Sequence, residues 1–263
     1  MQIDGKAINQ QIGQSLNEQI NEKGVVPRLG ILCVGDDPAS LSFINVKKKF
    51  GQNFGFEVNI LNIKEETEVS EVKAKLMELQ SQNDSVIVQL PLPAKFRDET
   101  QNILSTIEKT KDVDNLNEGD FEAPIVLALE EVFKIIPPFG KGEKIGLIGL
   151  GQVVGMPIKN YLDKDHQNKN YSLEIIKKGE ESKLKSCDVV ISGVGKPFLI
   201  KKEMLKEGCV LVDYGCSFVD GKACGDFDQD CFEIASYYTP VPGCMGPLVV
   251  ACLFKNVLKS IKI

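Results

Sequence analysis

The sequence has a single histidine, His166, among its 263 residues. A mechanism that requires two histidines is therefore excluded. No apolar run approaches the roughly 20 residues that a membrane-spanning helix needs. The first residues, Met-Gln-Ile-Asp-Gly-Lys, lack the apolar core of a secretory signal peptide. These absences predict a cytoplasmic protein that does not bind a membrane.

Cysteines are present, but the spacings of a metal site are missing. All of the eight cysteines except Cys33 lie between residues 187 and 252. No C-x-x-C pair occurs and His166 stands apart from them, so the ligand spacing of a zinc site is absent. Without a signal segment, disulfide bonds are not expected. We interpret the cysteines as reduced, small core residues and expect no metal site.

Charge and size narrow the class of protein further. Lys and Arg number 31 against 37 Asp and Glu, which gives a net charge of -6. A mildly acidic chain is a poor candidate for binding nucleic acid or an anionic membrane. The composition, 43% hydrophobic and 26% charged, is typical of a globular protein. The length is sufficient for one or two domains with a buried core.

Apolar periodicity predicts alternating helices and strands. In the first half it predicts helices over residues 8–20, 40–54, 69–79 and 99–107, and strands over 29–34, 56–63 and 85–89. Ser40 is the expected N-cap of the second helix. The second half has predicted helices over 125–136 and 245–261, a breaker-rich junction at 137–142, and strands over 144–149, 173–176, 188–192 and 209–213. This alternation predicts an α/β fold, with a parallel sheet covered by helices on both faces.

A glycine-rich turn follows the strand predicted at 144–149. It reads Gly149-Leu150-Gly151-Gln152-Val153-Val154-Gly155. Gly149 permits a tight turn, Gly151 has no Cβ to block a pyrophosphate, and the next helix offers free N–H groups at its start. The spacing departs by one residue from the common dinucleotide fingerprint, and a turn needed only for packing would look the same. Its place between a strand and a helix favours dinucleotide binding by Gly149, Leu150, Gly151, Val154 and Gly155.

The strand predicted at 173–176 ends at Lys177 and Lys178. In such folds the end of this strand contacts the adenosine ribose, and an acidic residue there favours NAD. Two ammonium groups would instead attract a 2′-phosphate, although a solvated lysine pair would give the same sequence. NADP is therefore the expected cofactor, with NAD as the alternative.

Further segments carry chemically useful side chains. Phe43 and Lys47 are four residues apart on a predicted helix and share a face. Gln89 ends a buried strand, where open α/β sheets place ligands. Most lysines are solvated and a glutamine can simply cap a strand, so spacing alone assigns neither a role. Residues 111–115 and the rigid stretch 238–247, which has three prolines, also read as a solvated loop and a connector before a helix.

Taken together, these segments resemble the bifunctional methylenetetrahydrofolate dehydrogenase/cyclohydrolase family, over nearly the whole chain and in the same order. The matching motifs are Pro38-Ala39-Ser40, Phe43-Ile44-x-x-Lys47-x-Lys49, Val88 to Pro93, Lys111-Asp112-Val113-Asp114, Gly149 to Pro157, Gly193-x-Gly195-x-Pro197, Val212-Asp213-x-Gly215, Gly225-Asp226 and Thr239 to Gly243. Each motif is modest evidence by itself, and their ordered occurrence makes the resemblance specific.

The resemblance implies an N-terminal α/β catalytic domain over residues 1–120 and a Rossmann-like NAD(P)-binding domain over 121–244. It implies that a final helix, 245–263, packs back on the first domain and that a folate cleft lies between the domains. The implied assembly is a homodimer, and the implied substrates are tetrahydrofolate derivatives. The implied activity, part of one-carbon metabolism, is oxidation of 5,10-methylenetetrahydrofolate to the 5,10-methenyl form and hydrolysis of that form to 10-formyltetrahydrofolate.

The resemblance also implies roles for single residues. Lys47 matches the lysine central to cyclohydrolysis, Gln89 matches its companion, and Asp114 matches the carboxylate that grips the pterin ring. The remaining matched positions are expected to bind substrate, namely Phe43, Leu90, Pro91, Pro242 and Gly243, or cofactor, namely Gly193 and Gly195.

Several positions depart from the family pattern. Phe43 stands for a tyrosine, Asn115 for a glycine, Leu150 and Gly151 for an arginine and a serine of the cofactor turn, Cys244 for a glycine and Val249 for a threonine. A Cβ at Cys244 is unfavourable if the backbone there needs a positive φ. Loss of the arginine removes a familiar NADP contact, which Lys177 or Lys178 would have to replace. The alternatives are therefore a monofunctional enzyme or a non-catalytic protein that binds folate or a nucleotide.

Overall fold

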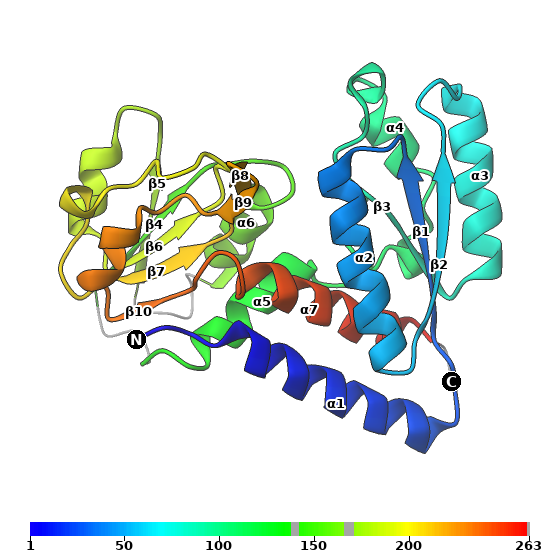
Figure 1. Cartoon of the computed structure of the whole chain (residues 1–263), viewed down its shortest axis with the longest axis horizontal. Helices are drawn as coiled ribbons and strands as arrows, with labels where there is room; N and C mark the ends of the chain where they lie inside the picture. The colour runs from blue at the N-terminus through cyan, green and yellow to red at the C-terminus, as the bar shows by residue number, and fades with distance from the viewer. Residues whose placement is uncertain (138–141, 166–170, 262–263) are drawn as a thin grey trace. The chain divides into compact units, whose positions relative to one another are not determined.

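The computed structural model describes residues 1–137, 142–165 and 171–261, which fall into two compact units (Figure 1). One unit combines Met1–Ile8 with Ile125–Val249, and the other combines Asn9–Pro124 with Val250–Ile263. The N-terminal residues therefore belong to the unit formed mainly by the second half of the chain, and the C-terminal residues belong to the unit formed mainly by the first half. His166 and residues 138–141 of the breaker-rich junction lie outside the described residues.

The unit of residues 9–124 is built on a parallel three-stranded sheet. Its strands pair in the order β2-β1-β3 and are β1 (Arg28–Val34), β2 (Glu57–Ile63) and β3 (Ser85–Val88). Two helices, α2 (Pro38–Asn53) and α3 (Val69–Gln82), connect them. The strands and helices predicted here are confirmed with small shifts at their ends. The apolar runs of β1 and β3 predicted them well because both strands are almost entirely buried.

The start of α2 differs from the prediction. The side chain of Asp37 accepts a hydrogen bond from the backbone N–H of Ser40 at 2.8 Å, so Asp37 is the N-cap and Ser40 is not. Pro38 occupies the first turn, where its missing N–H removes no helical hydrogen bond. The helix therefore begins at Pro38.

The long helices α1 (Gly5–Lys23) and α7 (Met245–Ser260) complete this unit with most of their length. Phe254 of α7 packs against Phe50 of α2 and against Phe56, with ring centroids 5.1 and 4.7 Å apart. Asn256 donates a hydrogen bond from Nδ2 to the backbone oxygen of Val113 at 2.9 Å. α4 (Thr100–Leu104) is shorter than the helix predicted over residues 99–107. The core beside α3 and α4 includes Leu32, Val34, Val72, Leu76, Val86, Val88, Ile103 and Leu104.

The other unit carries a parallel five-stranded sheet. Its strands pair in the order β10-β7-β6-β4-β5 and are β4 (Glu143–Ile148), β5 (Tyr171–Ile176), β6 (Val189–Ser192), β7 (Val210–Asp213) and β10 (Tyr237–Tyr238). α5 (Pro124–Phe133) precedes β4, and α6 (Gly155–Asp165) follows it. The predicted α/β fold and the predicted strands of this half are confirmed.

Three short strands were not predicted, because their sequences show no apolar periodicity. β8 (Ser217–Val219) and β9 (Lys222–Cys224) form an antiparallel hairpin, and β10 spans only two residues. The start of the chain extends the sheet edge, because Gln2 forms a bridge with Tyr238 and the N–H of Ile3 donates to the Tyr238 oxygen at 2.9 Å. Segments this short cannot display periodicity, so their pairing follows from the fold around them.

One face of the five-stranded sheet is covered by 3₁₀ helices. Leu184, Leu205 and Cys231, which lie in or beside these turns, form one core cluster with Val190 and Leu211 of the sheet. The turns span Glu181–Ser186, Lys202–Met204 and Gln229–Glu233.

Within the described ranges, no helix is both long and apolar enough to cross a bilayer. All eight cysteines are free thiols, of which Cys216 is exposed and the others are buried. The described part of the chain contains no group of three or more His, Cys, Asp or Glu side chains that could hold a metal ion.

Candidate active site and cofactor pocket

Lys47 is a buried lysine in α2. Only 5% of the residue is exposed, and its Nζ donates a hydrogen bond to Oε1 of Gln89 at 3.0 Å. Gln89 directly follows β3, where its backbone N–H donates to the Leu32 oxygen at 2.8 Å and its Nε2 donates to the Leu90 oxygen at 2.7 Å. Because the amide nitrogen is held by Leu90, the amide oxygen is turned to the lysine.

Asp114 acts electrostatically on Lys47. Burial lowers the pKa of Lys47 and raises the pKa of Asp114, and the attraction between the two groups partly offsets both shifts. Phe43, one turn before Lys47 on α2, places its ring centroid 4.8 Å from the lysine Nζ. The net effect of burial is an amine that gives up its proton more readily than a solvated lysine does.

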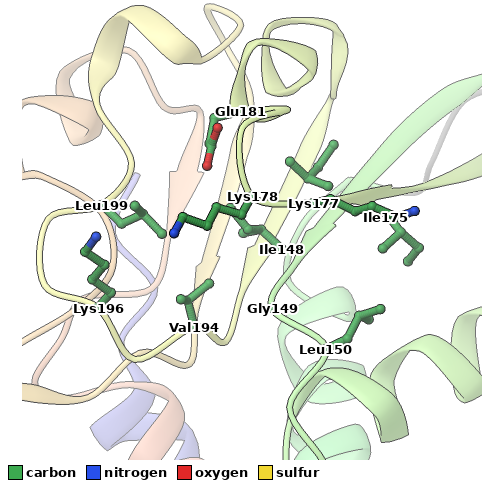
Figure 2. Close-up of a pocket in the computed structure, with 11 residues that line it drawn as sticks. Ile148, Gly149, Leu150, Ile175, Lys177, Lys178, Glu181, Val194, Lys196 and Leu199 are labelled. Atoms are coloured by element: carbon green, nitrogen blue, oxygen red, sulfur yellow. The ribbon is translucent and has the colours of Figure 1, made fainter.

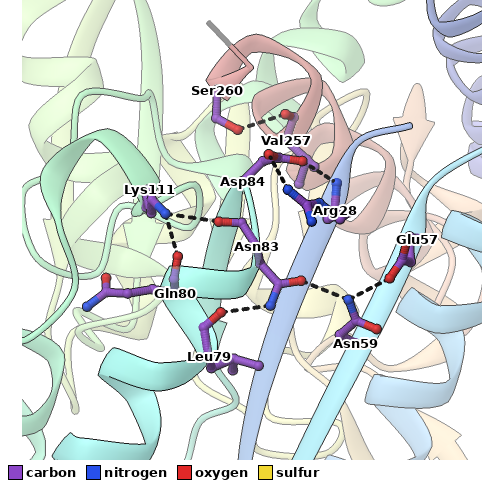
Figure 3. A network of polar contacts seen from close by, with 10 residues as sticks. All are labelled: Arg28, Glu57, Asn59, Leu79, Gln80, Asn83, Asp84, Lys111, Val257 and Ser260. Atoms are coloured by element: carbon purple, nitrogen blue, oxygen red, sulfur yellow. Dashed lines mark hydrogen bonds and ion pairs between the residues drawn. The ribbon is translucent and has the colours of Figure 1, made fainter. Parts of the chain in front are cut away.

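Lys111 fixes the start of the segment that carries Asp114. Its Nζ donates to the backbone oxygens of Gln80 and Asn83 at the end of α3, the latter at 3.0 Å (Figure 3). A cation near the last carbonyls of a helix satisfies oxygens that have no partner inside the helix. Lys111 therefore acts as an anchor of this segment to α3.

Asp112 closes the turn that follows Asp114. Its buried carboxylate accepts hydrogen bonds from the backbone N–H groups of Leu116 at 3.1 Å and Asn117 at 2.7 Å. Asn115 has a φ of 54°, in the left-handed region that glycine and asparagine tolerate best. The replacement of a glycine by Asn115 therefore keeps the backbone conformation that this turn requires.

The two loops expected to bind substrate lie in different units. Leu90, half-buried, and exposed Pro91 follow β3 and are joined by a cis peptide bond. Pro242, exposed, and half-buried Gly243 precede α7 in the other unit. The structure therefore brings Leu90 to Gln89 directly, whereas Pro242 and Gly243 belong to the unit of the glycine-rich turn.

Cys244 does not carry the backbone strain considered from the sequence. It is not among the described non-glycine residues with positive φ, whereas its neighbour Gly243 has a φ of 125°. Cys244 is buried, and a Cβ on Gly5 would lie 2.8 Å from its Sγ. The thiol thus packs against the start of α1.

The glycine-rich turn after β4 separates positions needed for packing from one that faces open space. Gly149 has a φ of 90°, and a Cβ there would lie 2.9 Å from backbone atoms of Gly193. A Cβ on Gly155, the first residue of α6, would overlap the Gly149 oxygen, and one on Gly193 would lie 2.5 Å from Cγ1 of Val154. A Cβ on Gly151, by contrast, would meet nothing within 4 Å.

A cavity of about 560 Å³ lies at the carboxyl ends of β4 and β5 (Figure 2). Its lining includes the predicted cofactor residues Gly149, Leu150, Lys177 and Lys178. The other predicted cofactor residues are not part of this lining, namely Gly151, Val154, Gly155, Gly193 and Gly195. Gly193 and Val154 instead pack the loops after β6 and β4 together, and Gly195 has a φ of 71° with open space where a Cβ would be.

Sequence reasoning assigned no role to Lys196 and Asp226. Lys196 also lines the cavity. The fully buried Asp226 accepts a hydrogen bond from the backbone N–H of Lys196 and so holds the loop that carries Lys196. Lys196 lies in the loop a few residues after β6 ends at Ser192, whereas Lys177 and Lys178 directly follow β5, so the strand-end rule indicated its loop but not the residue. The burial of Asp226 is tertiary and had no local signal.

Comparison with known proteins places both halves of the chain in one family. Residues 3–114 match the catalytic domain of tetrahydrofolate dehydrogenase/cyclohydrolase, and residues 131–263 match the NAD(P)-binding domain of the same family. The bifunctional protein FolD of Staphylococcus aureus is 34% identical over 280 residues, covering 99% of this chain and 96% of that protein.

Solved structures agree. Bifunctional FolD from Campylobacter jejuni has a TM-score of 0.86 at 30% identity, covering 99% of this chain and 98% of that one. The Trypanosoma brucei FolD structure, a complex with NADP cofactor and inhibitor, has a TM-score of 0.87 at 25% identity, covering 99% and 96%. The chain therefore belongs to the tetrahydrofolate dehydrogenase/cyclohydrolase family, the bifunctional FolD enzymes of one-carbon folate metabolism.

Proposed function

We propose that this chain oxidises 5,10-methylenetetrahydrofolate to the 5,10-methenyl form with NAD(P) and hydrolyses that form to 10-formyltetrahydrofolate. The observation that carries this proposal is the buried Lys47 amine. It is hydrogen-bonded to Gln89 at 3.0 Å, and its pKa is lowered by burial and partly restored by the charge of Asp114. Family membership over both domains supports the same chemistry.

Lys47 is the proposed proton acceptor of the hydrolytic step. Water adds to the positively charged methenyl carbon and loses a proton. The bond from that carbon to N5 then breaks, as the remaining hydroxyl proton leaves to form the formyl carbonyl and N5 gains a proton. Burial lowers the pKa of Lys47, so a larger fraction of this amine is neutral and able to take the proton that water loses near neutral pH. Gln89 accepts a hydrogen bond from Nζ at 3.0 Å and so fixes the direction of the amine.

Asp114 and Phe43 are proposed to hold the pterin. A carboxylate accepts paired hydrogen bonds from two adjacent N–H groups, which the pterin edge presents. Burial raises the pKa of Asp114, and the charge of Lys47 partly offsets that rise. A ligand that donates two hydrogen bonds to the carboxylate would favour its ionised form further. Phe43 offers a ring for stacking. Leu90, Pro91, Pro242 and Gly243 are the remaining proposed folate contacts.

The residues after β4 and β5 fit an NAD(P) molecule. The cavity of about 560 Å³ is bordered by Gly149 and Leu150, and the open position at Gly151 leaves the start of α6 accessible to phosphates. When bound, the cofactor supplies the acceptor for the hydride that leaves the methylene carbon. Gly193 and Gly195 would shape the loop beside it. NADP is the preferred choice, because Lys177 and Lys178 place positive charge where NAD enzymes usually have a carboxylate.

The proposed domain limits are residues 1–120 with the helix 245–263 for catalysis and residues 121–244 for NAD(P) binding. The proposed assembly is a homodimer, which sedimentation equilibrium measures directly. The eight free thiols support a reducing compartment such as the cytoplasm.

Two assays of the purified protein test the two reactions. The protein is mixed with 5,10-methylenetetrahydrofolate and either NADP or NAD, and reduced cofactor is followed by absorbance near 340 nm. Hydrolysis is followed separately as decay of the methenyl absorbance with appearance of 10-formyltetrahydrofolate. We expect both reactions, with the first faster for NADP. Ligand-induced stabilisation without either reaction would contradict the proposal and identify a binding protein.

A further inference from the structure

Three lysines line the cavity from two sides of the glycine-rich turn. Lys177 and Lys178 follow β5, and Lys196 lies in the loop after β6. The strand order β6-β4-β5 puts these two loops on opposite sides of β4, which ends at Gly149. The carboxyl ends of parallel strands share one edge, so both loops face the same opening.

The side chains of the lysines differ in direction. Figure 2 shows the side chain of Lys178 extending towards Leu199, on the side of the cavity that also carries Lys196. The side chain of Lys177 extends the other way, beside Ile175. Adjacent residues at a strand end point to opposite sides, so only one of the two lysines can join Lys196.

The backbone around Lys196 is held by Asp226. One carboxylate oxygen, Oδ1, accepts the N–H of Lys196 at 2.7 Å, and the other, Oδ2, accepts the N–H groups of Val194 at 2.9 Å and Gly195 at 3.2 Å. Oδ2 also accepts the hydroxyl of Ser192 at 2.6 Å. A loop fixed by four hydrogen bonds to a fully buried carboxylate loses little backbone entropy when a ligand binds.

The charges of Lys178 and Lys196 are not neutralised by an ion pair within the described part of the chain. Other lysines of this unit are paired; Lys201, for example, lies 2.5 Å from Asp228, and Lys206 lies 2.5 Å from Asp188. Glu181, the acidic residue of the cavity lining, has Oε1 bound to the N–H of Gly179 at 3.0 Å, and this hydrogen bond, together with the charge of Lys178, lowers the pKa of Glu181 without forming an ion pair with Lys178. The cavity therefore keeps positive charge available for an anion.

We propose that Lys178 and Lys196, and not Lys177, form the subsite for the 2′-phosphate of NADP. This inference deepens the proposed function and rests on its assignment of a dinucleotide to this cavity. A phosphate monoester carries close to two negative charges near neutral pH, which two unpaired ammonium groups from separate strands can share. The pair would take the place of the arginine that Leu150 replaces, from different positions of the fold.

Binding measurements on the full-length protein test the pair without turnover. Isothermal titration calorimetry compares adenosine 2′,5′-bisphosphate with adenosine 5′-monophosphate, which differ only in the 2′-phosphate. The variants are Lys178→Ala, Lys196→Ala, Lys196→Arg and Lys177→Ala, and the matched control is Lys222→Ala, at an exposed lysine outside the cavity lining. Each alanine at the pair should weaken the bisphosphate by roughly tenfold and leave the monophosphate unchanged, since one charged hydrogen bond contributes about that factor. Lys196→Arg should retain most of the affinity.

Each outcome decides between the alternatives. The pair is supported if the bisphosphate binds tighter than the monophosphate, if Lys178→Ala and Lys196→Ala each weaken it, and if Lys177→Ala and the control Lys222→Ala bind it as the unsubstituted protein does. Equal affinity for both nucleotides, or a loss with Lys177→Ala as large as with Lys178→Ala, overturns it. If the enzyme is active and Lys196→Ala does not change its affinity for the bisphosphate, the inference is overturned and the proposed function stands. Lysine-dependent bisphosphate binding by a protein inactive in both reactions supports the subsite and overturns the proposed function.

Discussion

Nζ of Lys47 and Oε1 of Gln89 lie 3.0 Å apart, although 42 positions separate the two residues in the sequence. The glutamine stands at the end of a buried strand, and its amide nitrogen is held by the Leu90 oxygen at 2.7 Å. The lysine thus faces a neutral acceptor of fixed direction while burial lowers its pKa. A carboxylate in the place of this amide would reverse that effect, because an adjacent negative charge favours the ammonium form.

Replacement of the Lys47 amine should remove the hydrolytic reaction. Lys47→Met keeps the apolar part of the side chain and deletes the group that takes the proton. We expect the rate of methenyltetrahydrofolate hydrolysis to fall by at least about 100-fold, the usual contribution of a positioned acid or base. The decay of the methenyl absorbance after mixing with purified variant measures this rate.

Lys48→Met is the control for that substitution, because Lys48 is the exposed neighbour on the same helix. It should hydrolyse the substrate at the unsubstituted rate. Normal turnover by Lys47→Met, with the fold intact by circular dichroism, would contradict the role assigned to Lys47.

Gln89→Glu should move the pH profile of hydrolysis. The new carboxylate beside Lys47 Nζ favours the charged amine and raises the pKa of Lys47. Since the neutral amine is the proposed proton acceptor, the rising limb of the rate against pH should shift to higher pH. If the hydrolysis rate falls at every pH while the rising limb stays at the same pH, Gln89 has only a structural role.

The regular elements were predictable because their residues report burial locally. The run from Leu29 to Val34 is almost fully buried and reads as a strand without any knowledge of its neighbours. Gln89 was found through the rule that ligands gather at strand ends. The contact with Lys47 was not derivable from spacing, because it depends on how α2 packs beside the sheet. Its expected role came from the family resemblance.

Residues whose role depends on distant backbone groups escaped prediction. Asp213 and Asp226 belong to motifs that match the family, but the sequence assigned neither an individual role; 2% and 0% of these residues are exposed. Their partners are N–H groups of other loops, such as the Asp226 N–H that donates to Asp213 Oδ2 at 2.9 Å. Backbone donors carry no sequence signal, so neither this pair nor the fixed position of Lys196 could be predicted.

Asp213 should make the protein less stable as pH rises from about 4 to about 7. Burial, with the nearby Asp226 charge, raises the pKa of Asp213 from 3.8 to about 7. Between these values the folded state retains a proton that the unfolded state has released, so the free energy of unfolding falls with pH. The slope from this group is at most about 1.4 kcal/mol per pH unit. Urea denaturation at several pH values from about 4 to 8 measures it.

Asp213→Asn cannot ionise and should flatten that dependence. Asp120→Asn, at an exposed position, is the matched control and should keep the original slope. Other buried groups contribute too: the raised pKa values of Asp112 and Asp114 act in the same direction, whereas the lowered pKa of Lys47 acts in the opposite one. The comparison between variants isolates Asp213. Equal slopes in Asp213→Asn and the unsubstituted protein would refute the assignment.

Asn115 offers a separate test of the turn after Asp114. Its φ of 54° suits glycine and asparagine, and its buried Oδ1 has no hydrogen-bond partner. Asn115→Ala should unfold at lower urea and lose about 1 kcal/mol, because alanine has a Cβ but lacks the short polar side chain that lets asparagine tolerate the left-handed region. Asn115→Gly should be at least as stable as Asn115→Ala, since both remove the unpartnered oxygen and only glycine also removes the Cβ. The opposite order would show that the turn does not retain this conformation in solution.

Gly151 and Gly155 separate ligand binding from packing within one turn. A Cβ on Gly155 would overlap the Gly149 oxygen, whereas a Cβ on Gly151 would meet nothing within 4 Å. Gly155→Ala should therefore lower the free energy of unfolding, and Gly151→Ala should leave it within about 0.5 kcal/mol of the original. Gly151→Ala should nevertheless weaken NADPH binding, measured by fluorescence titration, because its methyl group projects into the space proposed for the pyrophosphate. Unchanged NADPH affinity in Gly151→Ala would place the pyrophosphate elsewhere.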